Sequence, residues 1–196
     1  MAKKQTKQST GKLRIIGGKW RSRFLPVVDL PGLRPTTDRV RETLFNWLQN
    51  DVPGAHCLDL FAGSGALGFE AASRGAASVI LLEKQKQAAE ILAANINDLK
   101  AEHIKLLQCD ALSWLNSKPS GLFDIVFIDP PFDSDYLAQA IALLENLPCL
   151  SEHACIYLEM DSKQALPALP ESWRVVREKK AGQVSYYLVR RNFVAE

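Results

Sequence analysis

The chain of 196 residues has few cysteines, and none is placed as in a zinc site or a disulfide framework. There is no Cys-x-x-Cys pair and no histidine at a zinc-ligand spacing. Cys57 and Cys109 lie in apolar, strand-like runs. We therefore expect reduced cysteines and no bound metal. The four cysteines are Cys57, Cys109, Cys149 and Cys155.

Long hydrophobic runs are also missing. No segment approaches the ~20 apolar residues that a membrane-spanning helix requires. The start, MAKKQTKQSTGK, has the charge of a secretory signal, but no apolar stretch follows it. A cytoplasmic protein without a membrane partner is expected, and we expect a monomer.

Acidic residues are absent from positions 1–28, which hold eight of the 24 lysines and arginines. The remainder carries 16 basic and 22 acidic residues, so it is net −6 although the whole chain is +2. With 47% hydrophobic residues the chain is expected to form one globular domain. The concentrated positive charge indicates contacts with phosphates.

Three regions are expected along the chain. Residues 1–12 are expected to form a flexible basic tail, residues 13–52 a basic arm with a hairpin and a helix, and residues 53–196 the core. In the arm, LRII-GG-KWRSRFLPV predicts two short strands around a Gly17-Gly18 turn. A helix follows over 37–50, capped by Thr36 or Thr37.

The core alternates short apolar runs with helical patterns, which predicts a doubly wound, mostly parallel α/β sheet covered on both faces. The C-terminal segment 173–191 instead predicts an antiparallel hairpin with a turn near Ala181-Gly182. The expected strands are 56–61, 78–83, 104–108, 122–128 and 154–159. The expected helices are 65–74, 85–99, 111–116 and 134–147.

The stretch LDLFAGSGALGFEA places Gly63, Gly65 and Gly68 between the first core strand and its helix. This context is the one that a nucleotide-binding glycine loop requires. Glu83, 20 residues beyond Gly63, ends the next strand, where a carboxylate can bind a ribose. These features fit NAD and S-adenosylmethionine equally.

Two further acids favour a cationic cofactor. Asp59 precedes the glycine loop and Asp110 follows the third core strand. Together with Glu83 they would repel a pyrophosphate but suit an ammonium and a sulfonium. Asp110 has an alternative role as the cap of the helix that follows. An NAD-dependent oxidoreductase is further disfavoured because the three histidines lie at strand beginnings, the wrong end of the sheet.

Asp129-Pro130-Pro131-Phe132 follows the fourth core strand and should face the same crevice. Asp129 and the Pro130 carbonyl can accept the two hydrogens of an exocyclic amine and aim its lone pair at a methyl group. Consecutive prolines fix that carbonyl and remove competing N–H donors. Phe132 can stack on an extruded base. Guanine N2 and adenine N6 amines both satisfy this geometry.

The elements DLFAGSGALGFEA, LLEK, CDAL and IDPPF, in this order, resemble class I S-adenosylmethionine-dependent methyltransferases that act on amines. RIIGGKWRSRFLPVVDLPGLRPTTDRVRETLFNWL resembles, more specifically, the bacterial small-subunit (16S) rRNA guanine-N2 methyltransferase D family. The resemblance spans about Leu13 to Arg191. It implies a seven-stranded Rossmann-like sheet with a C-terminal antiparallel hairpin, S-adenosylmethionine as donor, and guanine N2 in 16S rRNA as acceptor.

The resemblance also implies roles for individual residues. The methionine moiety is expected at Asp59, Gly63 and Gly65, the ribose at Glu83, and the adenine edge at Asp110 and Ala111. Asp129 to Phe132 are expected to hold the target guanine. Additional cofactor contacts are expected from Phe61, Lys84 and Asp129.

The arm is short, which suits a substrate with an existing shape, such as a folded rRNA loop or an assembled ribosomal particle. Alternatives are an adenine-N6 nucleic-acid methyltransferase and a non-catalytic RNA-binding module. The residues expected to contact phosphates are Arg14, Lys19, Arg21, Arg23, Arg34, Arg39 and Arg41.

Overall fold

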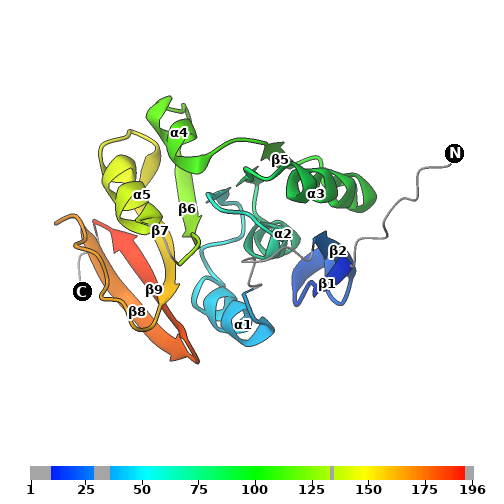
Figure 1. Ribbon diagram of the computed structural model, residues 1–196, viewed down its shortest axis with the longest axis horizontal. Helices are drawn as coiled ribbons and strands as arrows, with labels where there is room; N and C mark the ends of the chain where they lie inside the picture. The colour runs from blue at the N-terminus through cyan, green and yellow to red at the C-terminus, as the bar shows by residue number, and fades with distance from the viewer. Residues whose placement is uncertain (1–9, 29–35, 133–134, 193–196) are drawn as a thin grey trace, which may run out of the picture.

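A seven-stranded sheet with helices on both faces organises the computed structural model, which describes residues 10–28, 36–132 and 135–192. Figure 1 shows the sheet running from β5 at one edge to the β8–β9 pair at the other. A separate two-stranded hairpin, β1–β2, lies beside α2 and α3. The expected doubly wound α/β fold is confirmed.

The strand order is β5-β4-β3-β6-β7-β9-β8. Neighbours from β5 to β7 pair in parallel, whereas β9 is antiparallel to both β7 and β8, so the expected C-terminal hairpin is confirmed. The strands are β3 His56–Asp59, β4 Ser78–Leu82, β5 Ile104–Leu107, β6 Phe123–Ile128, β7 Leu150–Asp161, β8 Trp173–Ala181 and β9 Val184–Arg191.

Each face of the sheet buries its own apolar core. On one face α1 Asp38–Trp47, α2 Ala66–Ser73 and α3 Lys86–Leu99 pack against side chains such as Phe127 and Tyr157. On the other, α4 Ala111–Asn116 and α5 Tyr136–Glu145 pack against their strand neighbours Val126 and Ile156. No helix in the described part of the chain is long and apolar enough to cross a membrane.

The N-terminal hairpin differs from its sequence prediction. It pairs β1 Thr10–Arg14 with β2 Phe24–Val28, and a 3-10 helix, Gly18–Trp20, lies between them. The Gly17-Gly18 tight turn and the strand through Lys19, Arg21 and Arg23 were therefore wrong. Thr10, Gly11 and Lys12, expected in the flexible tail, belong to β1.

The segment between β1 and β2 departs from the predicted tight turn because it packs closely against α2. A Cβ on Gly18, whose φ is +75°, would lie 1.9 Å from the Ser73 carbonyl oxygen, so only glycine can approach α2 this closely. Ser73 Oγ accepts a hydrogen bond from Trp20 N (2.9 Å) and donates one to the Gly17 carbonyl (2.6 Å). Ile15 and Trp20 are buried in the core beneath. The hairpin is thereby fixed to the sheet domain.

Candidate active site

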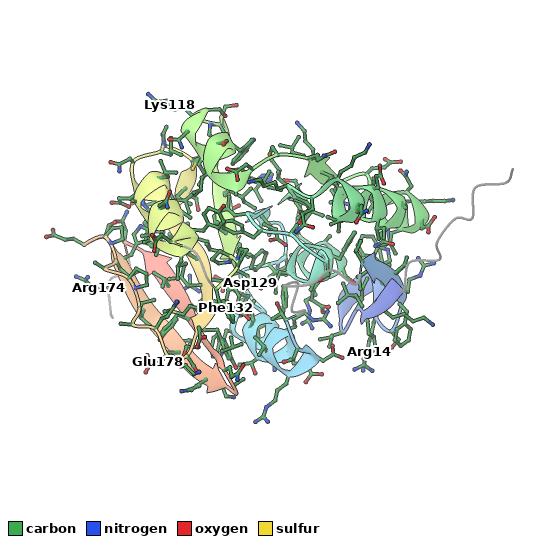
Figure 2. The ribbon with its side chains drawn as sticks, viewed as in Figure 1. Arg14, Lys118, Asp129, Phe132, Arg174 and Glu178 are labelled. Carbon is green, nitrogen blue, oxygen red and sulfur yellow. The ribbon has the colours of Figure 1, made fainter. Side chains whose placement is uncertain are left out.

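A cavity of about 620 Å³ lies at the carboxyl ends of the central strands. Six acidic residues line it. Asp59 ends β3, Glu83 follows β4, Asp129 follows β6 and Glu159 lies near the end of β7, while Asp110 precedes α4 and Asp161 ends β7. Figure 2 shows Asp129 and Phe132 near the middle of the molecule. The site lies where the sheet connections reverse direction, between β3 and β6, the usual ligand site of such sheets.

The glycine loop brings Asp59 and Glu83 together. Gly65 is the N-cap of α2, and its φ of +77° is a left-handed conformation that glycine adopts without a steric penalty. Asp59 Oδ2 accepts a hydrogen bond from Gly68 N (3.1 Å), and Glu83 Oε2 accepts one from Gly63 N (2.8 Å). Burial raises the pKa of Asp59 to about 7 and raises the pKa of Glu83. A cationic ligand would favour the ionised form of both.

Asp110 caps α4, one of the two roles that the sequence left open, and its place in the cavity is compatible with the other. Its Oδ1 accepts a hydrogen bond from Ser113 N (3.0 Å) and caps α4, while its Oδ2 pairs with Lys84 Nζ at 3.2 Å. The hydrogen bond from Ser113 N is the main cause of the lowered pKa of Asp110. Asp110 and the adjacent Ala111 both line the cavity.

An aromatic pair flanks this end of the cavity. Phe61 and Tyr136 stack with ring centroids 5.8 Å apart, and both line the cavity beside Lys84. Flat apolar faces next to polar carboxylates suit a planar heterocycle. Phe61 was expected at the site from the sequence, whereas Tyr136, at the start of α5, was not.

The corner formed by Asp129 to Phe132 faces the same cavity. Thr36 Oγ1 donates a hydrogen bond of 3.1 Å to Asp129 Oδ2. Burial, followed by the charge of Glu159, raises the pKa of Asp129 well above its usual value, and the Thr36 hydrogen bond opposes this shift. Asp129 is therefore a stronger base than an exposed aspartate. Gln164 Nε2 holds the Phe132 carbonyl at 3.2 Å.

Glu159 and Asp161 line the cavity as well, and the sequence singled out neither of them. The Glu159 side chain is only 4% exposed, and Tyr157 Oη donates a hydrogen bond of 2.6 Å to its Oε2. Burial is the main cause of the raised pKa of both Asp129 and Tyr157, and the charge of Glu159 adds to it. The signal for Glu159 was present in the sequence, because the run ACIYLE ends in an acid as the neighbouring strands do.

The basic residues expected to contact phosphates divide into two groups. Lys19, Arg21, Arg23 and Arg39 are exposed, as is Arg14, which pairs with Asp38 at 3.1 Å. Arg34 lies outside the described residues. Arg41 corrects the prediction, because it is 1% exposed and pairs with Asp38 at 2.6 Å. In this structure it stabilises the fold and is not presented to a phosphate.

Glu70 explains the burial of Arg41. This carboxylate, fully buried in α2, accepts hydrogen bonds from Ile16 N and Gly17 N, each 2.8 Å long. It also pairs with Arg74 Nε at 2.7 Å and lies 3.6 Å from an Arg41 guanidinium nitrogen. This network, which joins the hairpin, α1 and α2, was not predicted from the sequence.

Relatives of known name identify the family. The family model described as Conserved hypothetical protein 95 matches residues 13–190. Ribosomal RNA small subunit methyltransferase D of Escherichia coli strain K12 is 48% identical over 194 residues, covering 99% of this chain and 98% of the relative. The chain belongs to the ribosomal RNA small subunit methyltransferase D family. The resemblance to methyltransferase D seen in the sequence is thereby confirmed.

Solved structures extend the match to three dimensions. YhhF from Escherichia coli is 46% identical, with a TM-score of 0.86, and the alignment covers 94% of this chain and all of that one. SMU.776, solved in complex with SAH, shares only the fold, with a TM-score of 0.72 at 16% identity over 97% of this chain and 58% of that one. The chain therefore has the same fold as YhhF.

Other residues of this methyltransferase D chain were not singled out from the sequence as site residues. Thr36 was considered only as a helix cap, a position that Thr37 occupies by accepting a hydrogen bond from Val40 N. Phe24 lies opposite Arg14 in the hairpin and is 61% exposed, an unusual position for a large apolar side chain.

Among the described residues no group of three His, Cys, Asp or Glu side chains is placed to hold a metal.

Proposed function

We propose that this protein transfers the methyl group of S-adenosylmethionine to the N2 amine of a guanine in small-subunit ribosomal RNA. The observation that carries the proposal is the corner from Asp129 to Phe132 facing a cavity lined by Asp59 and Glu83. The name of its relatives, ribosomal RNA small subunit methyltransferase D, supports the reaction class and the RNA. The substrate implies a cytoplasmic activity.

S-adenosylmethionine fits the residues of the cavity. When bound, it supplies a methyl group on a positively charged sulfur, an electrophile for an amine. Asp59 and the loop from Gly63 to Gly65 would hold the methionine end, and Glu83 the ribose hydroxyls. Asp110, Ala111 and the stacked Phe61 would surround the adenine, with Lys84 at the edge. The raised pKa values of Asp59 and Glu83 show that burial disfavours their charged forms, and a bound cation would offset this effect.

The acceptor amine would be held by Asp129 and the Pro130 carbonyl, which accept its two hydrogens, while Phe132 stacks on the base. As the new N–C bond forms and the S–C bond breaks, the nitrogen becomes cationic and must lose a proton. Asp129 is placed to take it, and its raised pKa makes it a more effective base. Thr36 keeps the carboxylate oriented through its hydrogen bond.

RNA binding is proposed for the exposed basic residues of the hairpin and of α1. Arg14, Lys19, Arg21, Arg23 and Arg39 would contact phosphates, and Phe24, exposed among them, would stack on an unpaired base. Since these contacts are few and carry little base information, a preformed RNA shape is favoured, either a folded rRNA loop or an assembled particle. A monomer suffices, because one chain supplies every group named.

The decisive experiment compares rRNA nucleosides, by mass spectrometry, from cells with and without this protein. We expect loss of one N2-methylguanosine from small-subunit rRNA and its restoration by the purified protein with S-adenosylmethionine. Loss of N6-methyladenosine would overturn the guanine assignment. Unchanged nucleosides would favour a non-catalytic RNA-binding module. S-adenosylmethionine but not NAD should raise the melting temperature, because a ligand of the folded state stabilises it.

A further inference from the structure

Glu159 lies beside Asp129 on the floor of the same cavity. Strands β6 and β7 pair in parallel with Ile128 opposite Leu158, so the residues that follow, Asp129 and Glu159, occupy neighbouring positions at the carboxyl end of the sheet. Both side chains line the cavity. After burial, the charge of Glu159 is the next cause of the raised pKa of Asp129. The two carboxylates therefore lie close together and face the same cavity.

The proposed reaction uses only Asp129 and the Pro130 carbonyl to hold the amine. Glu159 is held in one orientation by the 2.6 Å hydrogen bond from Tyr157. A carboxylate has about four acceptor positions, and this one lines the cavity beside Asp129. The second acid thus suits a ligand with a donor next to the amine.

Guanine carries such a donor. Its N1–H lies next to the N2 amine on the Watson–Crick edge, so a guanine with its amine on Asp129 presents N1–H to a neighbouring acceptor. We propose that Glu159 accepts the hydrogen bond from guanine N1–H and is the residue that selects guanine as the methylated base. This inference rests on the proposed function and adds to it the group that reads the base.

The same carboxylate rejects other amines. In adenine the position next to the N6 amine is N1, which has a lone pair and no hydrogen. Bringing that lone pair against a carboxylate is repulsive and leaves Glu159 without the proton donor, and mismatches of this kind give strong discrimination. Asp129 and the prolines serve any exocyclic amine, so the discrimination must come from a residue beside them. Glu159 has that position.

The test uses two RNA substrates that differ at the methylated position, once it has been mapped with the wild-type protein. One carries guanine and the other 2-aminopurine, which keeps the 2-amine but has a lone pair at N1. We expect the wild type to prefer guanine by about 100-fold or more in kcat/KM. Glu159→Gln has an amide N–H that can donate to N1 of 2-aminopurine. Its preference for guanine should fall at least about tenfold, with the Kd for S-adenosylmethionine within about threefold of wild type.

Different results separate the possible failures. If the wild type methylates guanine and Glu159→Gln keeps its preference for guanine, Glu159 does not read the base and the inference is wrong while the proposed function stands. If the wild type methylates neither the guanine of the first RNA nor the 2-aminopurine of the second, the proposed function fails, and this inference fails with it. A merely structural role would lower the activity on both substrates equally and leave their ratio unchanged.

Two further variants keep the test decisive if Glu159→Gln does not fold. Glu159→Asp retains the charge but withdraws the carboxylate by one methylene, and Tyr157→Phe removes only the hydroxyl group that orients Glu159. Both should lower the preference for guanine over 2-aminopurine, by about threefold or more. An unchanged ratio in both folded variants would overturn the inference as well.

Discussion

Thr36 Oγ1 donates a hydrogen bond of 3.1 Å to Asp129 Oδ2 and so joins the segment before α1 to the loop after β6, 93 residues later. This bond stabilises the ionised form of Asp129 against burial and against the charge of Glu159. The N-terminal end of α1 is therefore joined to Asp129, the proposed reacting group. Substitutions on the two sides of this hydrogen bond should have related effects on methyl transfer.

Thr36→Val should lower kcat by about tenfold, because one hydrogen bond to a charged group contributes about 1.5 kcal/mol or more. Without this donor the already raised pKa of Asp129 rises further. Since the amine requires an ionised acceptor, activity should increase with pH through that pKa, and the acidic limb of the kcat profile should move to higher pH. Thr36→Ser, which keeps the hydroxyl group, is the control and should retain the wild-type profile. An unshifted limb in Thr36→Val would contradict this role.

Asp129→Ala should reduce kcat by about 10³-fold or more, because it removes both the acceptor that positions the amine and the base that takes its proton. The Kd for S-adenosylmethionine, measured by calorimetry, should change by less than about threefold. Asp135→Ala is a matched control, because Asp135 is an exposed aspartate six positions further along whose side chain makes no capping bond. A similar loss in both variants would count against a specific role for Asp129.

Binding of S-adenosylmethionine should strengthen by about tenfold from pH 6 to pH 8. Burial raises the pKa of Asp59 to about 7, so the carboxylate is mostly protonated at pH 6, and a cationic ligand prefers its ionised form. For the same reason the contribution of Asp59 to stability of the free protein is present below its ordinary pKa and is lost as pH rises through about 7. Titration calorimetry across this range measures the first effect.

Asp59→Asn is the control for this pH dependence. An amide oxygen can still accept the hydrogen bond from Gly68 N but does not titrate. Affinity should be lower above pH 7 and should vary less with pH, while the free variant should be more stable than wild type above pH 7. If the wild type and Asp59→Asn show the same pH dependence of affinity, another group is responsible.

Glu70→Ala should destabilise the protein by about 3–5 kcal/mol, the usual effect of removing one partner from a buried charged network. The substitution removes the buried carboxylate beside Arg41, which keeps only its ion pair with Asp38, and takes the acceptor away from Ile16 N and Gly17 N. Urea unfolding gives the free energy. Glu90→Ala is the control, since Glu90 is an exposed helical glutamate 3.9 Å from Lys86, and it should change stability by less than about 0.5 kcal/mol.

The sheet and its helices were predictable from the sequence because local periodicity decides them. Acids and glycines at strand ends likewise predicted which groups would face one cavity, as Asp59, Glu83 and Asp129 do. The hairpin prediction failed because Gly18 is required for close packing against the Ser73 carbonyl, which is distant in the sequence, and not for a tight turn. Arg41 was misassigned for the same reason: its buried partner Glu70 is distant in sequence, and composition cannot distinguish a buried arginine from an exposed one.

The basic hairpin should bind RNA through two separable kinds of contact. Reversing the charge of Arg21 and Arg23 together should weaken binding strongly at low salt and reduce the slope of log K against log salt, because fewer counterions are released. Phe24→Ala should weaken binding by about 1–3 kcal/mol through lost stacking and leave that slope unchanged. Filter binding at several salt concentrations measures both quantities.

The control for these variants reverses the charges of Lys118 and Arg174, which Figure 2 shows far from Arg14 and the hairpin. The net charge changes by the same amount, so a general electrostatic attraction would be weakened equally in the two double variants, whereas a hairpin surface predicts a much larger effect for Arg21 and Arg23. Equal effects would reject the hairpin as the RNA-binding surface. A salt slope altered by Phe24→Ala would show that the phenyl group acts by positioning the neighbouring cations, since stacking on a base releases no counterions.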